Sequence, residues 1–584
     1  MNKYTERKNI LLLIALLKGH GIKKIVISPG TTNMMFAASV QQDSWFEIIS
    51  AADERSAAYI ACGLAHESGE PVVLSCTGAT ASRNYLPGLT EAFYRKLPVL
   101  AVTSMPGSDL PGQYIPQVLD RTVTPKDTVK LSVALPEIHN EEDEWKCNLL
   151  INQAILALTK DGGGPAHINL VASFSYNFQV EELPKTRIIR RVTMGDVLPE
   201  IPQEKTIAVF AGAHHQWKKD ETNALEQFCE RYGAFVLCDH TSGYRGRYRV
   251  LGALLGAQEQ LKQEEYTIDL LIDIGDVSGD YYTFPVKEVW RVSPDGELRD
   301  RFRKMTRIFQ MEEKVFFQSY VQAVQGKTYK HAGYEKFSGK LEEFRSNIPE
   351  LPFSNIWAAK ELSGKLPENS VIHFGILNSL RSWNFFELSD TIRSGSNVGG
   401  FGIDGCLSTL LGASLASPEK KYFAVIGDLA FFYDMNALGN RYFGKNVRIL
   451  LVNNGKGTEF RHYSHPASIL KEDADPFVAA AGHYGNKSGE LVKHYAQDLG
   501  FEYFSASDKE EFLRMSERFT TEEDTDRPML FEIFTDSEKE SEALSIIRNI
   551  EKNTSVKHFI KQKLGTQNIE LIKSKLKKSQ GTKV

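Results

Sequence analysis

The stretch from residue 422 to 460 constrains the fold of this chain more than any other. Apolar runs at 422–426 and 447–452 predict two strands. Apolar side chains at helical spacing between these runs predict a connecting helix (Phe432, Met435, Leu438 and Tyr442). A strand, a helix and a second strand in so short a span form one βαβ unit, so the two strands run parallel.

Polar residues follow both of these strands. Asp428 comes directly after the first strand and Asn454 comes after the second. Because the carboxyl ends of parallel strands meet at one edge of a sheet, we expect the side chains of Asp428 and Asn454 to lie close together. Their oxygens and the backbone carbonyl of Lys456 form a small set of hard ligands that suits Mg²⁺. The helix that opens at Leu429 and Ala430 offers N–H groups to phosphates. An ordinary α/β turn is the alternative interpretation.

This pair of motifs resembles the signature of thiamine diphosphate enzymes. The resemblance implies that Asp428 and Asn454 hold the Mg²⁺ that anchors the diphosphate of the cofactor. A glycine cluster at 399–405 precedes a predicted helix at 406–416, and on its own it is an ordinary loop. The resemblance implies that its Ile403, beside Gly402, lies under the cofactor and bends the two rings toward each other.

Length and composition limit the classes of protein that fit. The 584 residues, 42% of them hydrophobic, favour three domains over one or two. A net charge of −5 argues against a general nucleic-acid-binding protein. Six cysteines without a CxxC pair predict reduced, buried thiols, and no apolar stretch is long enough for a transmembrane helix. We therefore expect a cytoplasmic enzyme or binding protein.

Alternating strand and helix patterns predict an α/β protein with three doubly wound parallel sheets. The first domain spans 1–180, the central domain 190–330 and the third domain 347–545. A polar segment at 327–346 is predicted to be the linker before the third domain. The remaining residues, 546–584, form a lysine-rich tail with partial helical amphipathicity, which predicts a solvated helix. A helix that docks on a membrane surface or on a partner is the alternative.

The first domain carries a candidate for activating the cofactor. Glu54 follows a predicted strand and opens a predicted helix, where a carboxylate is ordinarily favoured by the helix dipole. In thiamine diphosphate enzymes a glutamate in this setting hydrogen-bonds N1′ of the aminopyrimidine, and this leads to removal of the C2 proton of the thiazolium. Burial of such a glutamate favours proton exchange near neutrality.

Further motifs occur in order between residues 8 and 545: Ser28-Pro29-Gly30, 53–58, Cys76-Thr77-Gly78, Asn378-Ser379, 402–405 and 427–438. Together they are similar to the 2-succinyl-5-enolpyruvyl-6-hydroxy-3-cyclohexene-1-carboxylate synthases of menaquinone biosynthesis. These enzymes decarboxylate 2-oxoglutarate and add the product to isochorismate. The resemblance implies that Pro29, Thr77, Asn378 and Ser379 bind the cofactor and that Gln117 faces the reacting carbon.

The chain departs from this family where the family carries arginines for the substrate carboxylates. Thr32, Met105, Trp383 and Val398 stand at those positions. Each lost arginine removes charge-assisted hydrogen bonds worth about 1.5–3 kcal/mol apiece. We therefore expect different substrates, with Trp383 and Met105 forming a wider apolar wall.

Other side chains are candidates for contacting the substrate. Arg381, Arg461 and His462 could replace part of the lost charge, although a histidine in this region is more commonly a surface-loop residue. Thr31 and Phe460 complete the set of candidate substrate residues, with Thr32, Trp383 and Val398 named above.

The resemblance also implies an assembly. A homodimer is the smallest active unit, with the cofactor between the first domain of one subunit and the third domain of the other, and a homotetramer is expected. The partners are a 2-oxo acid donor and an acceptor. Two alternatives stay open: a simple 2-oxo acid decarboxylase or acyloin synthase of sugar or secondary metabolism, and a catalytically silent binding protein of the same fold.

Overall fold

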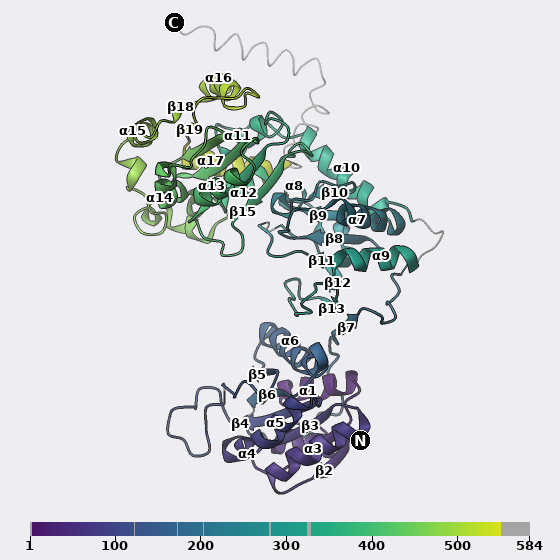
Figure 1. Ribbon diagram of the computed structural model, residues 1–584. Coiled ribbons are helices and arrows are strands. Elements are labelled where there is room, and N and C mark those ends of the chain that lie inside the picture. The colour runs from purple at the N-terminus through teal and green to yellow at the C-terminus, as the bar shows by residue number, and fades with distance from the viewer. Residues whose placement is uncertain are drawn as a thin grey trace, which may run out of the picture. The chain divides into compact units, whose positions relative to one another are not determined.

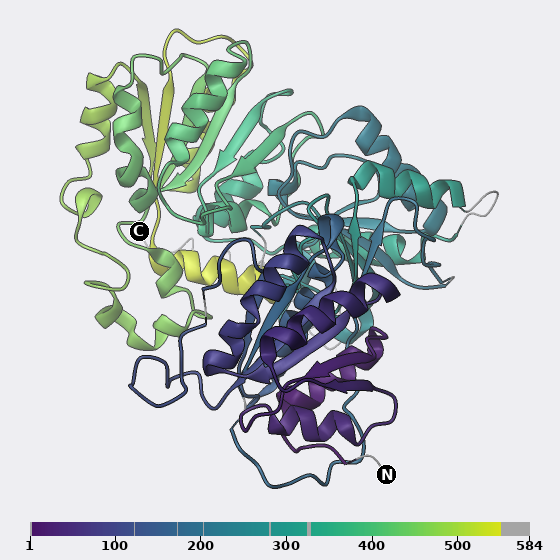
Figure 2. The ribbon, with the colours of Figure 1, turned by 60° about the horizontal axis from the view of Figure 1, so that its bottom comes forward.

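The computed structural model describes residues 3–550, apart from 122, 172, 203, 280–281 and 324–328 (Figure 1, Figure 2). The chain divides into two compact units. The first comprises Met1–Leu198 and Val289–Met311, and the second comprises Pro199–Glu288 and the chain from Glu312 onward. Most of the predicted basic tail lies outside the described residues. None of the described helices has the length and apolar character needed to cross a membrane.

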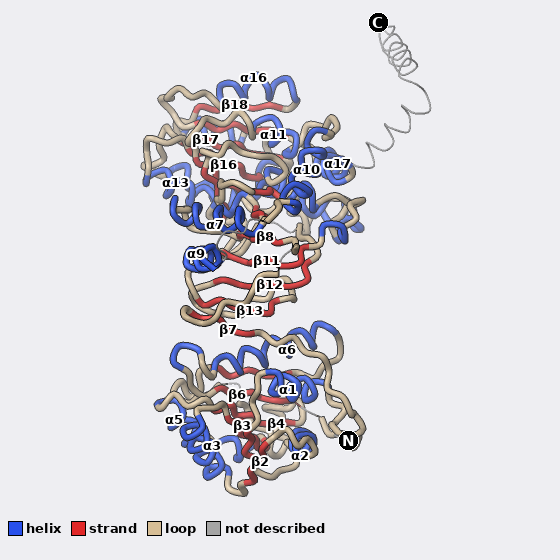
Figure 3. The backbone as a smooth tube through the Cα atoms, turned by 90° about the vertical axis from the view of Figure 1, so that its right-hand side faces the viewer, coloured by secondary structure: helices blue, strands red, loops and turns tan. Residues whose placement is uncertain are grey.

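The first unit contains a parallel sheet with the strand order β2-β1-β3-β4-β6-β5. Its strands are β1 (Lys24–Ile27), β2 (Glu47–Ser50), β3 (Val72–Thr77), β4 (Val99–Met105), β5 (Leu131–Leu135) and β6 (Ala166–Val171). Helices cover both faces: α1 (Lys8–Gly19), α2 (Met34–Gln41) and α6 (Glu141–Ala157) on one, α3 (Glu54–Ser68), α4 (Ala79–Asn84) and α5 (Leu86–Tyr94) on the other (Figure 3). Val73 packs on the first face and Val72 and Leu74 on the second, so the strands are buried on both sides, as expected for parallel sheets.

The middle strands belong to both units. In the second unit the order is β10-β9-β8-β11, and in the first unit β12-β13-β7, all parallel. Their bounds are β7 (Arg190–Thr193), β8 (Ile207–Ala211), β9 (Phe235–Cys238), β10 (Arg249–Leu251), β11 (Ile268–Ile274), β12 (Val286–Val292) and β13 (Met305–Gln310). The accompanying helices are α7 (Lys219–Tyr232), α8 (Ala253–Gly256), α9 (Glu313–Ala323) and α10 (Ala332–Ser346).

The second unit also contains a parallel sheet with the order β15-β14-β16-β17-β19-β18, drawn in green and yellow in Figure 2. Its strands are β14 (Val371–Phe374), β15 (Arg393–Ser396), β16 (Tyr422–Gly427), β17 (Val447–Asn453), β18 (Glu502–Ala506) and β19 (Met529–Phe534). Its helices are α11 (Asn355–Leu362), α12 (Asn378–Trp383), α13 (Cys406–Ala416), α14 (Asp428–Asp434), α15 (Leu491–Asp498), α16 (Lys509–Phe519) and α17 (Ser537–Arg548). β16 and β17 are parallel neighbours, so the predicted βαβ unit is present. The prediction of three doubly wound parallel sheets is confirmed.

The predicted helix of the βαβ unit ends earlier than expected. The helix after β16 stops at Asp434 and continues as a 3₁₀ turn, Met435–Gly439. Gly439 and Asn440 are weak helix formers, and Tyr442 beyond them is 59% exposed.

The predicted polar linker at 327–346 is wrong for most of its length. Residues 327 and 328 lie outside the described residues, and Ala332–Ser346 forms helix α10. Phe337, Leu341 and Phe344 are buried at spacings of four and three, which is one face of a helix. The charged residues between them gave the segment its polar composition and concealed this apolar stripe.

The six cysteines lie in the interior. All are buried and none forms a disulfide. Burial raises the pKa of the Cys62 thiol to about 11 and that of Cys76 to about 12, so both thiols are protonated at neutral pH. The prediction of reduced, buried thiols is confirmed.

Candidate functional site

Asp428 lies at the carboxyl edge of the sheet in the second unit, directly after β16. It is 5% exposed. Oδ1 accepts a hydrogen bond from the Leu429 N–H at 2.8 Å, and Oδ2 accepts one from the Gly455 N–H at 2.6 Å. Burial raises the pKa of Asp428 to about 6. Within the described chain no lysine or arginine pairs with this carboxylate. The Leu429 N–H, which was expected to bind phosphate, donates instead to Asp428.

The two asparagines after β17 have different surroundings. Asn453 donates to Glu532 Oε1 at 2.7 Å, inside the sheet. The Oδ1 atom of Asn454 is buried and has no hydrogen-bond partner among the residues that the structure describes. An unsatisfied buried oxygen costs about 1–3 kcal/mol, which a bound cation would offset. The carboxylate of Asp428 and the amide oxygen of Asn454 are thus a ligand pair that fits Mg²⁺.

Lys456, the third predicted metal residue, directs its side chain elsewhere. Its Nζ atom forms an ion pair with Asp475 Oδ2 at 2.6 Å. The charge of the Lys456 ammonium is therefore neutralised by Asp475. The backbone carbonyl of Lys456 stays the predicted metal ligand.

The glycine cluster at 399–405 is held by side chains on both sides. The Asn397 amide donates to the Gly405 carbonyl at 3.2 Å, and Asp434 accepts hydrogen bonds from the backbone N–H and the hydroxyl of Ser408 at 2.7 and 2.6 Å. Gly402 is half-buried, and Ile403 packs partly buried against the core of the third sheet. The loop conformation is thus set before any ligand binds.

Helix α12 begins with an unusual backbone conformation. Leu377 has φ of +62°, a strained value for a branched side chain, immediately before Asn378. The Asn378 amide nitrogen donates to Glu459 Oε2 at 2.6 Å and to His462 Nε2 at 3.0 Å, and its oxygen accepts from the Glu459 N–H at 3.0 Å. Ser379 is buried. Because the Asn378 side chain is engaged by these neighbours, the predicted cofactor contacts of Asn378 and Ser379 stay predictions.

The candidate replacement cations are compensated by acids of this chain. Arg381 forms an ion pair with Glu459. Arg461 pairs with Asp475 at 3.2 Å and with Glu472 at 3.6 Å. These contacts leave little positive charge for a substrate carboxylate.

His462 is not a surface-loop residue. It is 8% exposed, and burial lowers its pKa to about 4, so it is neutral at pH 7. Its Nδ1 atom is buried, and none of the described residues forms a hydrogen bond with it. Phe460, two residues earlier, is half-buried and meets the ring of His465 edge-on at 5.2 Å.

The expectation of a wide apolar wall is wrong for Trp383. This side chain is 1% exposed and packs on Phe374, with 5.5 Å between ring centroids. Val398 and Met105 are also buried, at 4% and 5% exposure. Trp383 ends the short helix α12 on the side that faces the core, so its ring fills the interior and presents no surface to a ligand.

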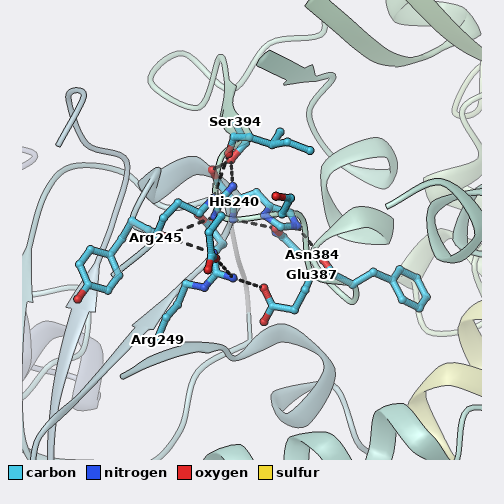
Figure 4. A network of polar contacts seen from close by, with 12 residues as sticks. His240, Arg245, Arg249, Asn384, Glu387 and Ser394 are labelled. Carbon is cyan, nitrogen blue, oxygen red and sulfur yellow. Dashed lines mark hydrogen bonds and ion pairs between the residues drawn. The ribbon is translucent and has the colours of Figure 1, made fainter. Parts of the chain in front are cut away.

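A polar network that the sequence did not indicate connects the loop after β9 to the C-terminal end of α12 and the residues that follow it. His240 Nε2 lies 3.1 Å from the Trp383 carbonyl and 3.0 Å from the Phe386 carbonyl, and the His240 N–H donates to Asn384 Oδ1 at 3.0 Å (Figure 4). Burial lowers the pKa of His240 to about 3, so the ring is neutral and its N–H can serve these carbonyls.

Two arginines extend this network. Arg245 donates to Ser394 Oγ at 2.7 Å, and Ser394 donates to the His240 carbonyl at 2.6 Å. Arg249 pairs with Glu387 at 2.6 Å (Figure 4). The network therefore ties both α12 and β15 to the β9–β10 loop, and only contacts between distant segments reveal it.

Glu54, in the first unit, is the first residue of α3. It is half-buried, and Oε2 accepts a hydrogen bond from Asn84 at 3.3 Å. Asp53 caps the same helix by accepting from the Ser56 N–H at 2.7 Å. The expected burial of Glu54 is not met within this unit, because α3 follows β2, the edge strand of its sheet.

The loops after β1 and β3 lie against each other in the first unit. A Cβ atom on Gly30 would lie 2.0 Å from Thr77 Cγ2, so glycine is needed for this approach. Pro29 and Thr31 are exposed, and Thr32 donates from Oγ1 to the Ser104 carbonyl at 3.0 Å. Gly30, which follows Pro29, and Thr77 are thereby brought together at the carboxyl edge of the sheet.

Gln117 lies in an exposed segment of the first unit, with φ of +66°. Its side chain is exposed, and a left-handed backbone is uncommon for glutamine. Its predicted position at the reacting carbon stays a prediction.

Comparisons with known proteins agree with this arrangement. Residues 11–123 match the family described as thiamine pyrophosphate enzyme, N-terminal TPP binding domain. A 2-succinyl-5-enolpyruvyl-6-hydroxy-3-cyclohexene-1-carboxylate synthase of Bacteroides fragilis is 33% identical over 563 residues, which cover 93% of this chain and 98% of the relative. The synthase of the same name from Phocaeicola vulgatus is 32% identical with the same coverage, and that from Desulfotalea psychrophila is 28% identical over 89% of this chain and 97% of the relative.

Proposed function

Because this chain belongs to the family of 2-succinyl-5-enolpyruvyl-6-hydroxy-3-cyclohexene-1-carboxylate synthases, we propose that it is a thiamine diphosphate- and Mg²⁺-dependent enzyme that decarboxylates a 2-oxo acid. The bond between the carbonyl carbon and the carboxylate breaks, CO₂ leaves, and the acyl carbon forms a new bond to an acceptor. Thiamine diphosphate, when bound, stabilises the negative charge that loss of CO₂ leaves on that carbon.

The side chains of the second unit support this cofactor assignment. Asp428 and Asn454 would hold Mg²⁺, since among the described residues the buried carboxylate of Asp428 has no cationic partner and the buried oxygen of Asn454 has no donor. Gly402 and Ile403 would shape the cofactor from a loop that Ser408 and Asn397 keep in place.

In the first unit, Glu54 would hold or deliver the proton at N1′ of the aminopyrimidine. Its place at the start of α3 leaves the carboxylate partly exposed, and it accepts a hydrogen bond from a neutral amide, Asn84. The resemblance makes a homodimer the smallest active unit and a homotetramer the assembly, which sedimentation of the pure protein would measure.

We propose that the substrates differ from 2-oxoglutarate and isochorismate. The observation that carries this proposal is that Arg381, Arg461 and His462, the candidate replacements for the family's arginines, are paired with acids or neutral. Burying a carboxylate without a partner costs several kcal/mol. A donor with a single carboxylate therefore fits this chain better than a pair of substrates with several.

A direct assay tests the proposal. The enzyme is loaded with thiamine diphosphate and Mg²⁺, and CO₂ release is measured from pyruvate, 2-oxobutanoate and 2-oxoglutarate, the last with and without isochorismate. The Bacteroides fragilis synthase serves as the matched control. We expect faster release from a monocarboxylic 2-oxo acid and poor turnover of 2-oxoglutarate with isochorismate.

Each other outcome has a clear meaning. Efficient formation of the family's product contradicts the substrate proposal. Release of CO₂ without any acceptor product indicates a simple decarboxylase. A protein that binds the cofactor but releases no CO₂ from any 2-oxo acid is the silent binding protein.

A further inference from the structure

Arg121 is a buried positive charge in the first unit. Its side chain lies near the carboxyl ends of β3 and β4, and the residue is 4% exposed. Nη2 donates to Asn169 Oδ1 at 2.5 Å, whereas Nη1 is buried and has no hydrogen-bond partner in the described part of the chain. Among the described residues, none of the carboxylates forms an ion pair with this guanidinium. In the part of the chain that the structure describes, its one hydrogen-bond partner is thus a neutral amide.

The surroundings of Arg121 supply no anion. The nearby Cys76 thiol is kept protonated, because burial raises its pKa to about 12. Arg83, also nearby, carries the same charge as Arg121. Burial lowers the pKa of Arg121 to about 10, so the side chain is still charged at neutral pH. Buried charges are normally paired, so this arrangement calls for an anion that the described part of the unit does not provide.

Gly78 leaves room beside the unpartnered nitrogen. A Cβ atom on Gly78 would lie 3.1 Å from Arg121 Nη1 and 3.1 Å from the Ser104 carbonyl, closer than an ordinary contact. Met105, next to Ser104, occupies a position where the family carries an arginine. A guanidinium therefore lies beside the strand end that lacks its expected arginine.

We propose that Arg121 binds the carboxylate of the 2-oxo acid substrate, in place of the arginine that the family carries at the position of Met105. This inference rests on the proposed function. The cofactor diphosphate is already assigned to Asp428 and Asn454, so a different anion is assigned to Arg121. One guanidinium matches one carboxylate, which agrees with a monocarboxylic donor.

The test compares Arg121→Met, Arg121→Lys and the control Arg95→Met, in which an exposed arginine at the end of α5 is removed. Each protein is loaded with thiamine diphosphate and Mg²⁺ and titrated calorimetrically with oxamate, an unreactive isostere of pyruvate. For Arg121→Met we expect at least 10-fold weaker oxamate binding and an at least 10-fold higher KM for the preferred 2-oxo acid. We expect a smaller change in kcat, and cofactor affinity within 2-fold of that of the original enzyme. Arg121→Lys should be intermediate, and the control unchanged.

Stability separates a binding role from a structural one. Removing an unpaired buried charge should leave the unfolding temperature of the ligand-free protein unchanged or raise it, whereas loss of a structural arginine lowers it. A lower unfolding temperature in both Arg121 variants, with cofactor and oxamate binding reduced alike, overturns the inference.

The same data separate this inference from the proposed function. Unchanged oxamate affinity and KM in Arg121→Met, in an enzyme that releases CO₂, overturn the role of Arg121 alone. The original holoenzyme is also titrated with N-oxalylglycine, the unreactive analogue of 2-oxoglutarate. If it binds neither oxamate nor N-oxalylglycine, the inference is also overturned. Arg121-dependent oxamate binding in a protein that releases no CO₂ supports the carboxylate site and contradicts the proposed function.

Discussion

The Asp428 carboxylate accepts a hydrogen bond from the Gly455 N–H at 2.6 Å, so the residues that follow β16 and β17 are directly joined. Gly455 has φ of +76°, a left-handed conformation that a glycine adopts without strain. This turn carries the chain away immediately after Asn454. The carboxylate and the buried amide oxygen of Asn454 are therefore held at the ends of neighbouring strands.

Replacing Asp428 by Asn should weaken Mg²⁺-dependent binding of thiamine diphosphate by on the order of 100-fold, because the variant loses the charge of a hard ligand. Asn keeps an acceptor for one of the two backbone N–H groups, so the fold should persist. Calorimetric titration with and without Mg²⁺ measures the effect, with Asp508→Asn, a helix-capping acid of α16, as the control. Equal cofactor affinity in both variants would exclude this metal site.

Glu54→Gln should reduce 2-oxo acid decarboxylation by on the order of 10²–10⁴-fold, because an amide cannot exchange a proton with the aminopyrimidine. The variant should fold and bind the cofactor. Deuterium exchange at C2 of the bound cofactor gives a readout independent of the substrate. The control is Glu67→Gln, an exposed acid near the other end of α3. Exchange in Glu54→Gln at the rate of the original enzyme would contradict the assignment.

Glu540→Gln should make stability less dependent on pH. Glu540 is 4% exposed, its oxygens accept from the Asn355 N–H at 2.9 and 3.1 Å, and burial raises its pKa from 4.5 to about 7. A raised folded pKa means that its contribution to stability is complete below pH 4.5 and is lost as the pH rises through 7. The difference amounts to about 3 kcal/mol.

Denaturant unfolding of the two proteins at pH 5 and pH 8 measures this effect. The variant should be more stable than the original protein at pH 8, and the difference should shrink or reverse at pH 5. Parallel pH profiles of the two proteins would show that Glu540 is not the titrating group.

Arg448→Met should destabilise the second unit by about 3 kcal/mol. Arg448 is 1% exposed, and Nη1 donates to the carbonyls of Phe519 and Thr521 at 2.8 and 2.7 Å, at the end of α16. Its loss leaves these carbonyls without a charged donor. Chemical unfolding measures the change, and Arg518→Met, which removes an exposed ion pair with Glu502, should cost less than about 1 kcal/mol. Equal losses in the two variants would contradict the capping role of Arg448.

Local sequence patterns were sufficient to predict the βαβ unit and the parallel sheets. The apolar runs at 422–426 and 447–452 lie within β16 and β17, because a parallel strand is buried on both faces and its sequence shows this directly. The same reasoning failed for α10, where Phe337, Leu341 and Phe344 form a narrow apolar stripe within a charged segment. The average composition of a whole segment does not show an apolar stripe on one face of a helix, because the polar residues on the other faces outnumber it.

By itself the sequence determined the fold class, the family and the identity of the residues at the strand ends, since each depends on residues close together in the chain. Only the tertiary structure decided which of those residues are free to bind a ligand. Arg381 is compensated by Glu459, 78 residues away, while Arg121 donates to the neutral amide of Asn169, 48 residues away, and pairs with no carboxylate of the described chain. Burial and ion pairing are set by segments that the fold brings together, and no local pattern encodes which charge finds its partner.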